Sequence, residues 1–194
     1  MNYYTNNVIN DVKDFQNKKY FKSWFKIVKP ILESDEFQRR KLFLHHTSNV
    51  YMHVLRVSYK SYVIARNLKL DSRTCAIAGI LHDFYPYPYK FNQVLYDLYP
   101  NYYIHYKEHK PLFKMHGYTH ALEACINSKK YFPDLIDDKI YSCILTHMFP
   151  LNIRLPKYKE AWIITTVDKI DSIDTLKEIK YVPVIIYKKI KSYI

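Results

Sequence analysis

The spacing of hydrophobic positions along the chain predicts a succession of helices. Apolar residues recur at intervals of three and four, the period of an amphipathic helix, in stretches separated by polar or proline-containing breaks. The predicted helices cover about residues 6–33 (as one or two helices), 50–68, 72–84, 114–132, 133–149 and 156–176. Only two glycines, Gly79 and Gly117, are present, which argues against a many-turned β-sandwich or barrel. We therefore expect an all-α fold.

One predicted helix ends in a pair of ionisable residues. Residues 75–84 (CAIAGILHDF) are apolar until His82 and Asp83, and a helix that is hydrophobic on all sides is buried. Burying two ionisable groups costs several kcal/mol unless they are hydrogen-bonded, paired or bound to metal. From this doublet alone, a buried His–Asp pair and a metal site are about equally good interpretations.

Other histidines lie on apolar helix faces. His53 belongs to the apolar stripe of residues 50–68, and His147 ends the stripe of a later helix. Each of them, taken alone, is more often a hydrogen-bonded core residue than a ligand. His116 and His120 are one turn apart on one face, a spacing that can bind metal, although His120 fits the surface equally well.

The last predicted helix carries two aspartates. Asp168 shares a face with Ala161 and Thr165, so it is expected to point inward, where a carboxylate needs a partner. The helical phase of Asp171 turns it away from that face, and we expect its replacement to be mild. His45 and His46 fall in a predicted loop, where we expect them to be solvated.

Six metal-competent residues therefore lie at inward faces or ends of predicted helices: His53, His82, Asp83, His116, His147 and Asp168. Their convergence in one helical core is better explained by metal ions than by six unrelated buried polar groups. The ordered pattern resembles the HD-domain superfamily of metal-dependent phosphohydrolases. The matching segments are YMHVLRV (51–57), AGILHD (78–83) and VDKI (167–170).

The resemblance covers about residues 50–176 and implies a helical bundle with the metal site in its core. In the branch of the superfamily that binds two metals, His53, His82 and Asp168 would bind one ion, His116 and His147 the other, and Asp83 would bridge them. The segments HGYTHAL (116–122) and THMFPL (146–151) are also similar to those of small bacterial HD-domain proteins. Histidine and carboxylate ligands suit Fe, Mn, Ni, Co or Zn.

The activity that this resemblance implies is hydrolysis of a phosphate ester or anhydride by a metal-bound hydroxide. Asp83 and Asp168 would act through the metals, and Arg56 and Lys169 would contact phosphate. The substrate would be a nucleotide or another small phosphorylated metabolite. Two alternatives stay open: a mixed-valent di-iron oxygenase of the HD fold, and a non-catalytic module that binds a nucleotide or nucleic acid.

Composition bears on the partners, the compartment and the state of the cysteines. The formal charge of +12 favours anionic ligands, but the basic residues are spread along the chain, so nucleic acid is not the favoured partner. No apolar stretch approaches a membrane span or a signal-peptide core, which predicts a cytoplasmic protein without a membrane partner. The three cysteines lie in apolar helical patterns, and we expect them to be reduced core residues. Nothing in the sequence indicates an oligomeric state.

The length predicts one domain over residues 1–194, with a core at about 50–176 and packing extensions at 1–49 and 177–194. The tyrosine-rich segment 85–111 is long for a connection, and such segments are commonly lids or binding loops. Prolines at its start preclude a continuous helix there.

Overall fold

The computed structural model of the protein describes residues 7–45, 48–88, 93–98 and 115–177. Regular structure in this part of the chain is helical apart from one antiparallel hairpin of β1 (Leu44–His45) and β2 (Ser48–Asn49), which confirms the all-α prediction. The α-helices are α1 (Val8–Asp11), α2 (Phe21–Leu32), α3 (Asp35–Gln38), α4 (Val50–Asn67), α5 (Ser72–Leu81), α6 (Gln93–Leu98), α8 (His116–Tyr131), α9 (Asp138–Thr146) and α10 (Lys159–Lys177). The 3₁₀ turns are η1 (Lys13–Phe15), η2 (Arg39–Leu42) and η4 (Pro133–Leu135).

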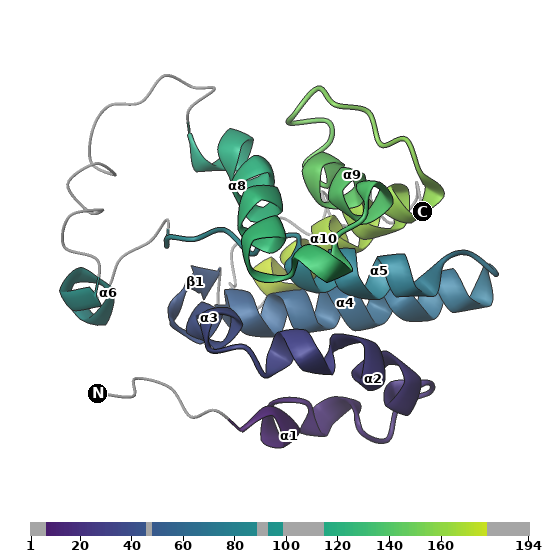
Figure 1. The fold of residues 1–194 in the computed structure, drawn as a ribbon, viewed down its shortest axis with the longest axis horizontal. Helices are drawn as coiled ribbons and strands as arrows, with labels where there is room; N and C mark the ends of the chain where they lie inside the picture. Colours follow the sequence, from purple (N-terminus) through teal and green to yellow (C-terminus); the bar gives the residue numbers. More distant parts are fainter. Residues whose placement is uncertain (1–6, 46–47, 89–92, 99–114, 178–194) are drawn as a thin grey trace.

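Helices α4 and α5 form the centre of the fold and lie side by side (Figure 1). Their backbones approach closely at Gly79, where an added Cβ would lie 2.8 Å from the Cα of Ser58. The Ser58 hydroxyl donates to the carbonyl oxygen of Ala76 at 2.7 Å, and Trp24 of α2 donates its ring N–H to Ser58 at 2.9 Å. Glycine is therefore required three residues before His82, and this contact fixes α5 relative to α4.

Other helices cover this pair from two sides. Figure 1 shows α1 and α2 below the α4–α5 pair and α8 and α9 above it. Helix α10 packs against α4, α5 and α9. The buried core includes Trp24, Leu55, Ile80 and Ile144, each 0% exposed. As a result, the ends of α5 and α9 and the inner faces of α4, α8 and α10 meet in the interior.

Several helix boundaries and faces differ from the sequence-based expectations. Pro133 opens the short turn η4, and α9 starts only at Asp138, because Asp137 caps it by accepting from the backbone N–H of Ile140 at 2.7 Å. Helix α6 lies within the segment expected to be irregular. Residues 89–92 and 99–111 of that segment lie outside the described residues.

Four apolar residues expected on buried stripes are exposed. On α4 they are Ile64 (37% exposed) and Leu68 just beyond it (60%), and on α8 they are Leu122 (42%) and Ile126 (60%). The apolar positions at the end of α4 and on this side of α8 are therefore not part of the buried core. The predicted inner face of α10 is correct, because Ala161, Ile164 and Thr165 are buried.

A partly buried polar network fixes the start of α5. Asp71 caps this helix by accepting from the backbone N–H of Thr74 at 3.0 Å. Glu160 of α10 accepts from the backbone N–H of Asp71 and from the ammonium group of Lys139, both at 3.0 Å. Burial opposes ionisation of Glu160, but these donors outweigh it and lower its pKa below the ordinary value of 4.5.

We expect Glu160→Gln to lower the free energy of unfolding at pH 7 by about 1 kcal/mol, since the charge-assisted bonds to Lys139 and to the backbone of Asp71 are weakened. A lowered folded-state pKa contributes stability above the unfolded pKa, and that stability is lost as pH falls through the folded pKa. The difference between variant and wild type should therefore shrink below about pH 4.5. Urea unfolding at several pH values measures it.

The matched control is Glu33→Gln. The Lys29–Glu33 pair is about half exposed, with side-chain exposures of 53% and 55%. Exposed pairs of this kind contribute about 0–1 kcal/mol. A loss at Glu160 that is no larger than the loss at Glu33, or that is unchanged at low pH, would contradict the role assigned to Glu160.

Candidate metal centre

The six residues predicted as ligands come from five helices. His53 lies on α4, His116 on α8 and Asp168 on α10. His82 and His147 are the C-terminal caps of α5 and α9, directly after the last helical residue. Asp83 follows His82. Residues His53, His82 and His147 are at most 1% exposed, and Asp83 and Asp168 are also buried. Helix ends and inner helix faces thus bring these five side chains into the interior of the bundle.

His53, His82 and Asp168 form a first group. The Nε2 atoms of His53 and His82 are 3.2 Å apart, and Oδ1 of Asp168 lies 3.0 Å from the former and 3.5 Å from the latter. One donor atom from each residue lies within 4.8 Å of the others. Two imidazoles and a carboxylate at this separation can surround one transition-metal ion.

Asp83 lies between this group and a second one. Its Oδ2 is 3.7 Å from Nε2 of His82 and 3.9 Å from Nε2 of His53. Its Oδ1 is 3.4 Å from Nε2 of His120 and 3.7 Å from Nε2 of His147. Each carboxylate oxygen therefore faces a different pair of histidines.

His120 belongs to the second group, so the expectation that it fits the surface equally well is wrong. It is 5% exposed, and its Nε2 lies 3.0 Å from Nε2 of His147. The ring of His116 stacks on that of His120, with centroids 4.8 Å apart, and meets the ring of Tyr85 edge to face at 4.6 Å. The assignment of His116 as a ligand stays a prediction, and His120 is the second donor that α8 offers.

Hydrogen bonds fix the tautomers of all four inward histidines. The Nδ1–H groups of His82, His147 and His120 donate to the carbonyl oxygens of Gly79 (2.9 Å), Ile144 (2.7 Å) and His116 (2.8 Å). Nδ1 of His53 donates to the carboxylate of Asp171 at 3.1 Å. Carbonyl and carboxylate oxygens only accept, so each Nδ1 carries the proton. In the neutral form each ring therefore turns the Nε2 lone pair towards the other ligands, the arrangement that metal-binding histidines have.

The electrostatics of the cluster also favour a bound cation. Burial alone would lower the pKa of His53, but hydrogen bonds to Asp168 and Asp171 outweigh it and raise the pKa to about 9. Burial likewise opposes the ionisation of Asp83, yet the surrounding histidines lower its pKa well below the ordinary value. Burial, with His82 and His120 nearby, lowers the pKa of His147 to about 3. The buried carboxylates therefore stabilise positive charge among them, and histidine with carboxylate is a donor set that fits divalent transition metals.

Asp171 does not point away, and the expectation drawn from its helical phase is wrong. It is 2% exposed, and it accepts from Nδ1 of His53, from Nε of Arg56 at 3.0 Å and from Nζ of Lys60 at 2.7 Å. Burial would raise its pKa, but His53, Lys60 and Arg56 lower it well below the ordinary value. Asp171 therefore holds His53 from the side opposite Nε2, a relation that orients a ligand histidine.

The two predicted phosphate contacts lie beside the cluster. Arg56 is half-buried and donates to Asp171. Lys169 donates to the carbonyl oxygen of His147 at 3.3 Å, and burial lowers the pKa of its ammonium group. Their contact with phosphate stays a prediction, since each has a protein acceptor in the structure.

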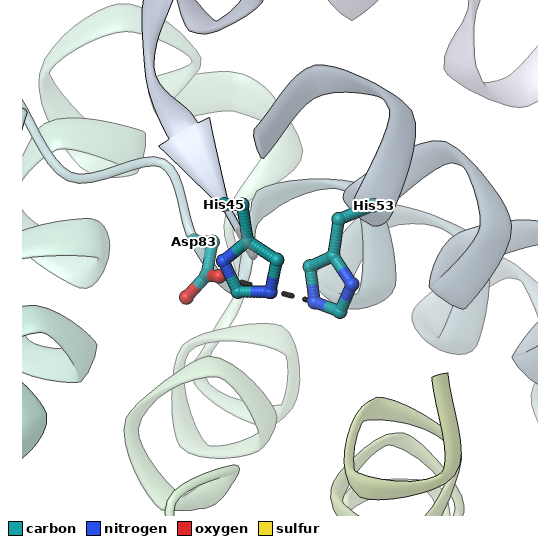
Figure 2. Close-up of side chains that lie close together, drawn as sticks. All are labelled: His45, His53 and Asp83. Carbon is teal, nitrogen blue, oxygen red and sulfur yellow. Dashed lines mark ion pairs between the residues drawn. The ribbon is translucent and has the colours of Figure 1, made fainter. Parts of the chain in front are cut away.

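His45 was also expected to be solvated, and the structure contradicts this. Its ring is half-buried and stacks on that of His53, with centroids 4.2 Å apart. A donor atom of His45 lies within 4.8 Å of donor atoms of His53 and Asp83 (Figure 2). Two adjacent histidines before the helix cap were the only signal in the sequence; His46 lies outside the described residues.

The core is helical, and its buried His-Asp doublet and further inward histidines form groups that could hold a metal ion. The profile of the HD domain matches residues 50–173, so the chain belongs to the HD domain family. Most members of this family are metal-dependent phosphohydrolases. No curated protein and no solved structure matches the chain. Among the described helices, none is both long and apolar enough to cross a membrane.

The two histidines of α8 can be separated by mutation. We expect His120→Ala to weaken binding of one metal ion by at least about 10-fold, because its Nε2 faces Asp83 and His147. His116→Ala should have a smaller effect, since its ring contacts His120 and Tyr85. Titration of the metal-free protein with Zn²⁺ against a chromophoric chelator measures both. A larger loss in His116→Ala would instead assign the metal to His116.

Proposed function

We propose that the protein is a metal-dependent phosphohydrolase that acts on a nucleotide or another small phosphorylated metabolite. The observation that carries the proposal is the convergence of four histidine Nε2 atoms on two buried carboxylates, each histidine held by a hydrogen bond at Nδ1. Membership of the HD domain family supports the same class of chemistry. Such a site, when loaded, lowers the pKa of a bound water and neutralises phosphate oxygens.

In this proposal the protein contributes geometry and charge. His53, His82 and Asp168 would hold one metal ion, His147 and a histidine of α8 would hold the other, and Asp83 would be a ligand of both. Arg56 and Lys169 bind the phosphate as it enters, since each is a cation beside the cluster that keeps exposure to solvent. The predicted compartment is the cytoplasm, and the predicted partner is the small phosphorylated substrate, with nucleic acid a less favoured partner.

Metal content and phosphate release test the proposal together. Protein purified without chelators is analysed for transition metals, then assayed for phosphate released from mono-, di- and cyclic nucleotides and from small sugar phosphates, with oxygen uptake recorded in parallel. About two metal ions per chain and phosphate release that is lost on chelation are the expected results. Oxygen uptake that needs iron would favour the oxygenase, and protein that takes up no Mn or Fe would overturn the proposal.

A further inference from the structure

The hairpin before α4 is anchored on both sides of His45. Residues His45 and Ser48 are paired across the hairpin, as are Leu44 and Asn49. Asn49 caps α4 by accepting from the backbone N–H of Met52 at 2.9 Å, and the N–H of Val50 donates to the carbonyl oxygen of Phe43 at 2.8 Å. The hairpin is therefore tied to the first turn of the helix that carries His53.

Alternation along the extended chain decides which way His45 faces. Successive side chains in extended backbone point to opposite sides, so Phe43 and His45 share one side and Leu44 takes the other. Phe43 is fully buried, whereas Leu44 is 39% exposed. His45 thus points to the interior with Phe43.

The segment after α5 meets this hairpin in reversed order. Tyr85 stacks on Phe43 with ring centroids 6.0 Å apart, and two residues earlier Asp83 lies within 4.8 Å of His45, measured between donor atoms. Each contact is two residues from the next on both segments. The packing of Phe43 against Tyr85 therefore sets the position of His45 against Asp83.

We propose that His45 is a further ligand of the metal ion that His53 holds. The three side chains of Figure 2 carry this inference: the His45 ring lies beside that of His53 with Asp83 close by, and one donor atom from each lies within 4.8 Å of the others. Two imidazoles and one carboxylate are a common donor set for Fe, Mn or Zn. The inference rests on the metal site of the proposed function and adds a donor from outside the segment that the family profile matches.

Three variants test the ligand role. His45→Ala removes the donor and the ring, His45→Phe keeps a ring that can stack on His53 but has no donor nitrogen, and Leu44→Ala changes the same hairpin on its outer side. Each protein is freed of metal, titrated with Zn²⁺ against a chromophoric chelator, and loaded with Co²⁺ to record visible absorption. The wild type should bind about two ions.

We expect His45→Ala and His45→Phe to weaken one of the two ions by at least about 10-fold and to change the Co²⁺ spectrum, because loss of even an outer-shell partner costs about 10- to 100-fold. Leu44→Ala should bind like wild type. Added imidazole should restore the spectrum of His45→Ala but not of His45→Phe, whose ring fills the space.

Two results would overturn the inference. Wild-type affinity and spectrum in both His45 variants would remove the ligand role, and a loss in His45→Ala that His45→Phe repairs would leave stacking on His53 as the only role. In either case a wild type that binds two ions keeps the proposed function. A wild type that binds none removes both.

Discussion

Replacing Asp83 with alanine is expected to abolish binding of both metal ions and, with it, phosphate release. Its two oxygens face different histidine pairs, Oδ2 towards His53 and His82 and Oδ1 towards His120 and His147, at 3.4–3.9 Å. One substitution therefore removes a ligand from each group and the negative charge between them. The metal content measured by elemental analysis should fall from about two ions per chain to near none.

Two comparisons make this result specific. His147→Ala should mainly weaken one ion, because its Nε2 lies 3.7 Å from Oδ1 of Asp83, whereas His53 and His82 face Oδ2. Asp83→Asn keeps the side-chain shape without the charge and should also lose metal. If Asp83→Ala kept both ions while its thermal unfolding stayed cooperative, the bridging position assigned to Asp83 would be wrong.

Asp171→Ala is expected to weaken metal binding by about 10- to 100-fold although Asp171 is not itself a proposed ligand. The substitution frees Nδ1 of His53, so the ring loses both its fixed tautomer and its orientation. It also leaves Arg56 and Lys60 without the carboxylate that they share. We therefore also expect a loss of about 1–3 kcal/mol in the free energy of unfolding.

Asp171→Asn serves as the matched variant. Its amide oxygen can still accept from Nδ1 of His53, so affinity for metal should be largely kept while the charge pairs with Arg56 and Lys60 are lost. Chelator competition and urea unfolding on both variants separate the two effects. Equal metal affinity in Asp171→Ala and wild type would show that the hydrogen bond to His53 has no orienting role.

Helical periodicity correctly predicted the fold and the inward direction of His53 and Asp168. This is because the side of a helix that packs on its neighbours carries the apolar residues, and both side chains lie on that side. The same period places Asp171, three residues further along α10, on the face of Asp168, so the expectation that Asp171 points away misapplied the helical phase. A carboxylate there is buried because Arg56 and Lys60 of α4 lie opposite it, at 3.0 and 2.7 Å. These ion pairs depend on how α4 and α10, which are distant in sequence, cross each other. The sequence of α10 alone therefore cannot predict them.

The same reason explains the misjudged histidines. His120 sits next to exposed Leu122 on α8, and its burial depends on α9 and on the segment after α5 packing over it. His45 was misjudged because a loop of two histidines and polar residues resembles any solvated turn. Only the pairing of Phe43 with Tyr85, which are 42 positions apart by their numbers, turns it inward.

The origin of the site in five separate helices has a consequence for assembly. Residues 53 and 168 bracket most of the described chain, and neither proposed ion has all of its ligands on two helices that are adjacent in sequence. A fragment of the bundle, or a partly folded chain, would therefore lack the site, and metal content would report the native fraction of a preparation. By the same linkage, a bound metal ion would stabilise the packing of all five helices together, by about 2.7 kcal/mol when free metal is at 100 times Kd.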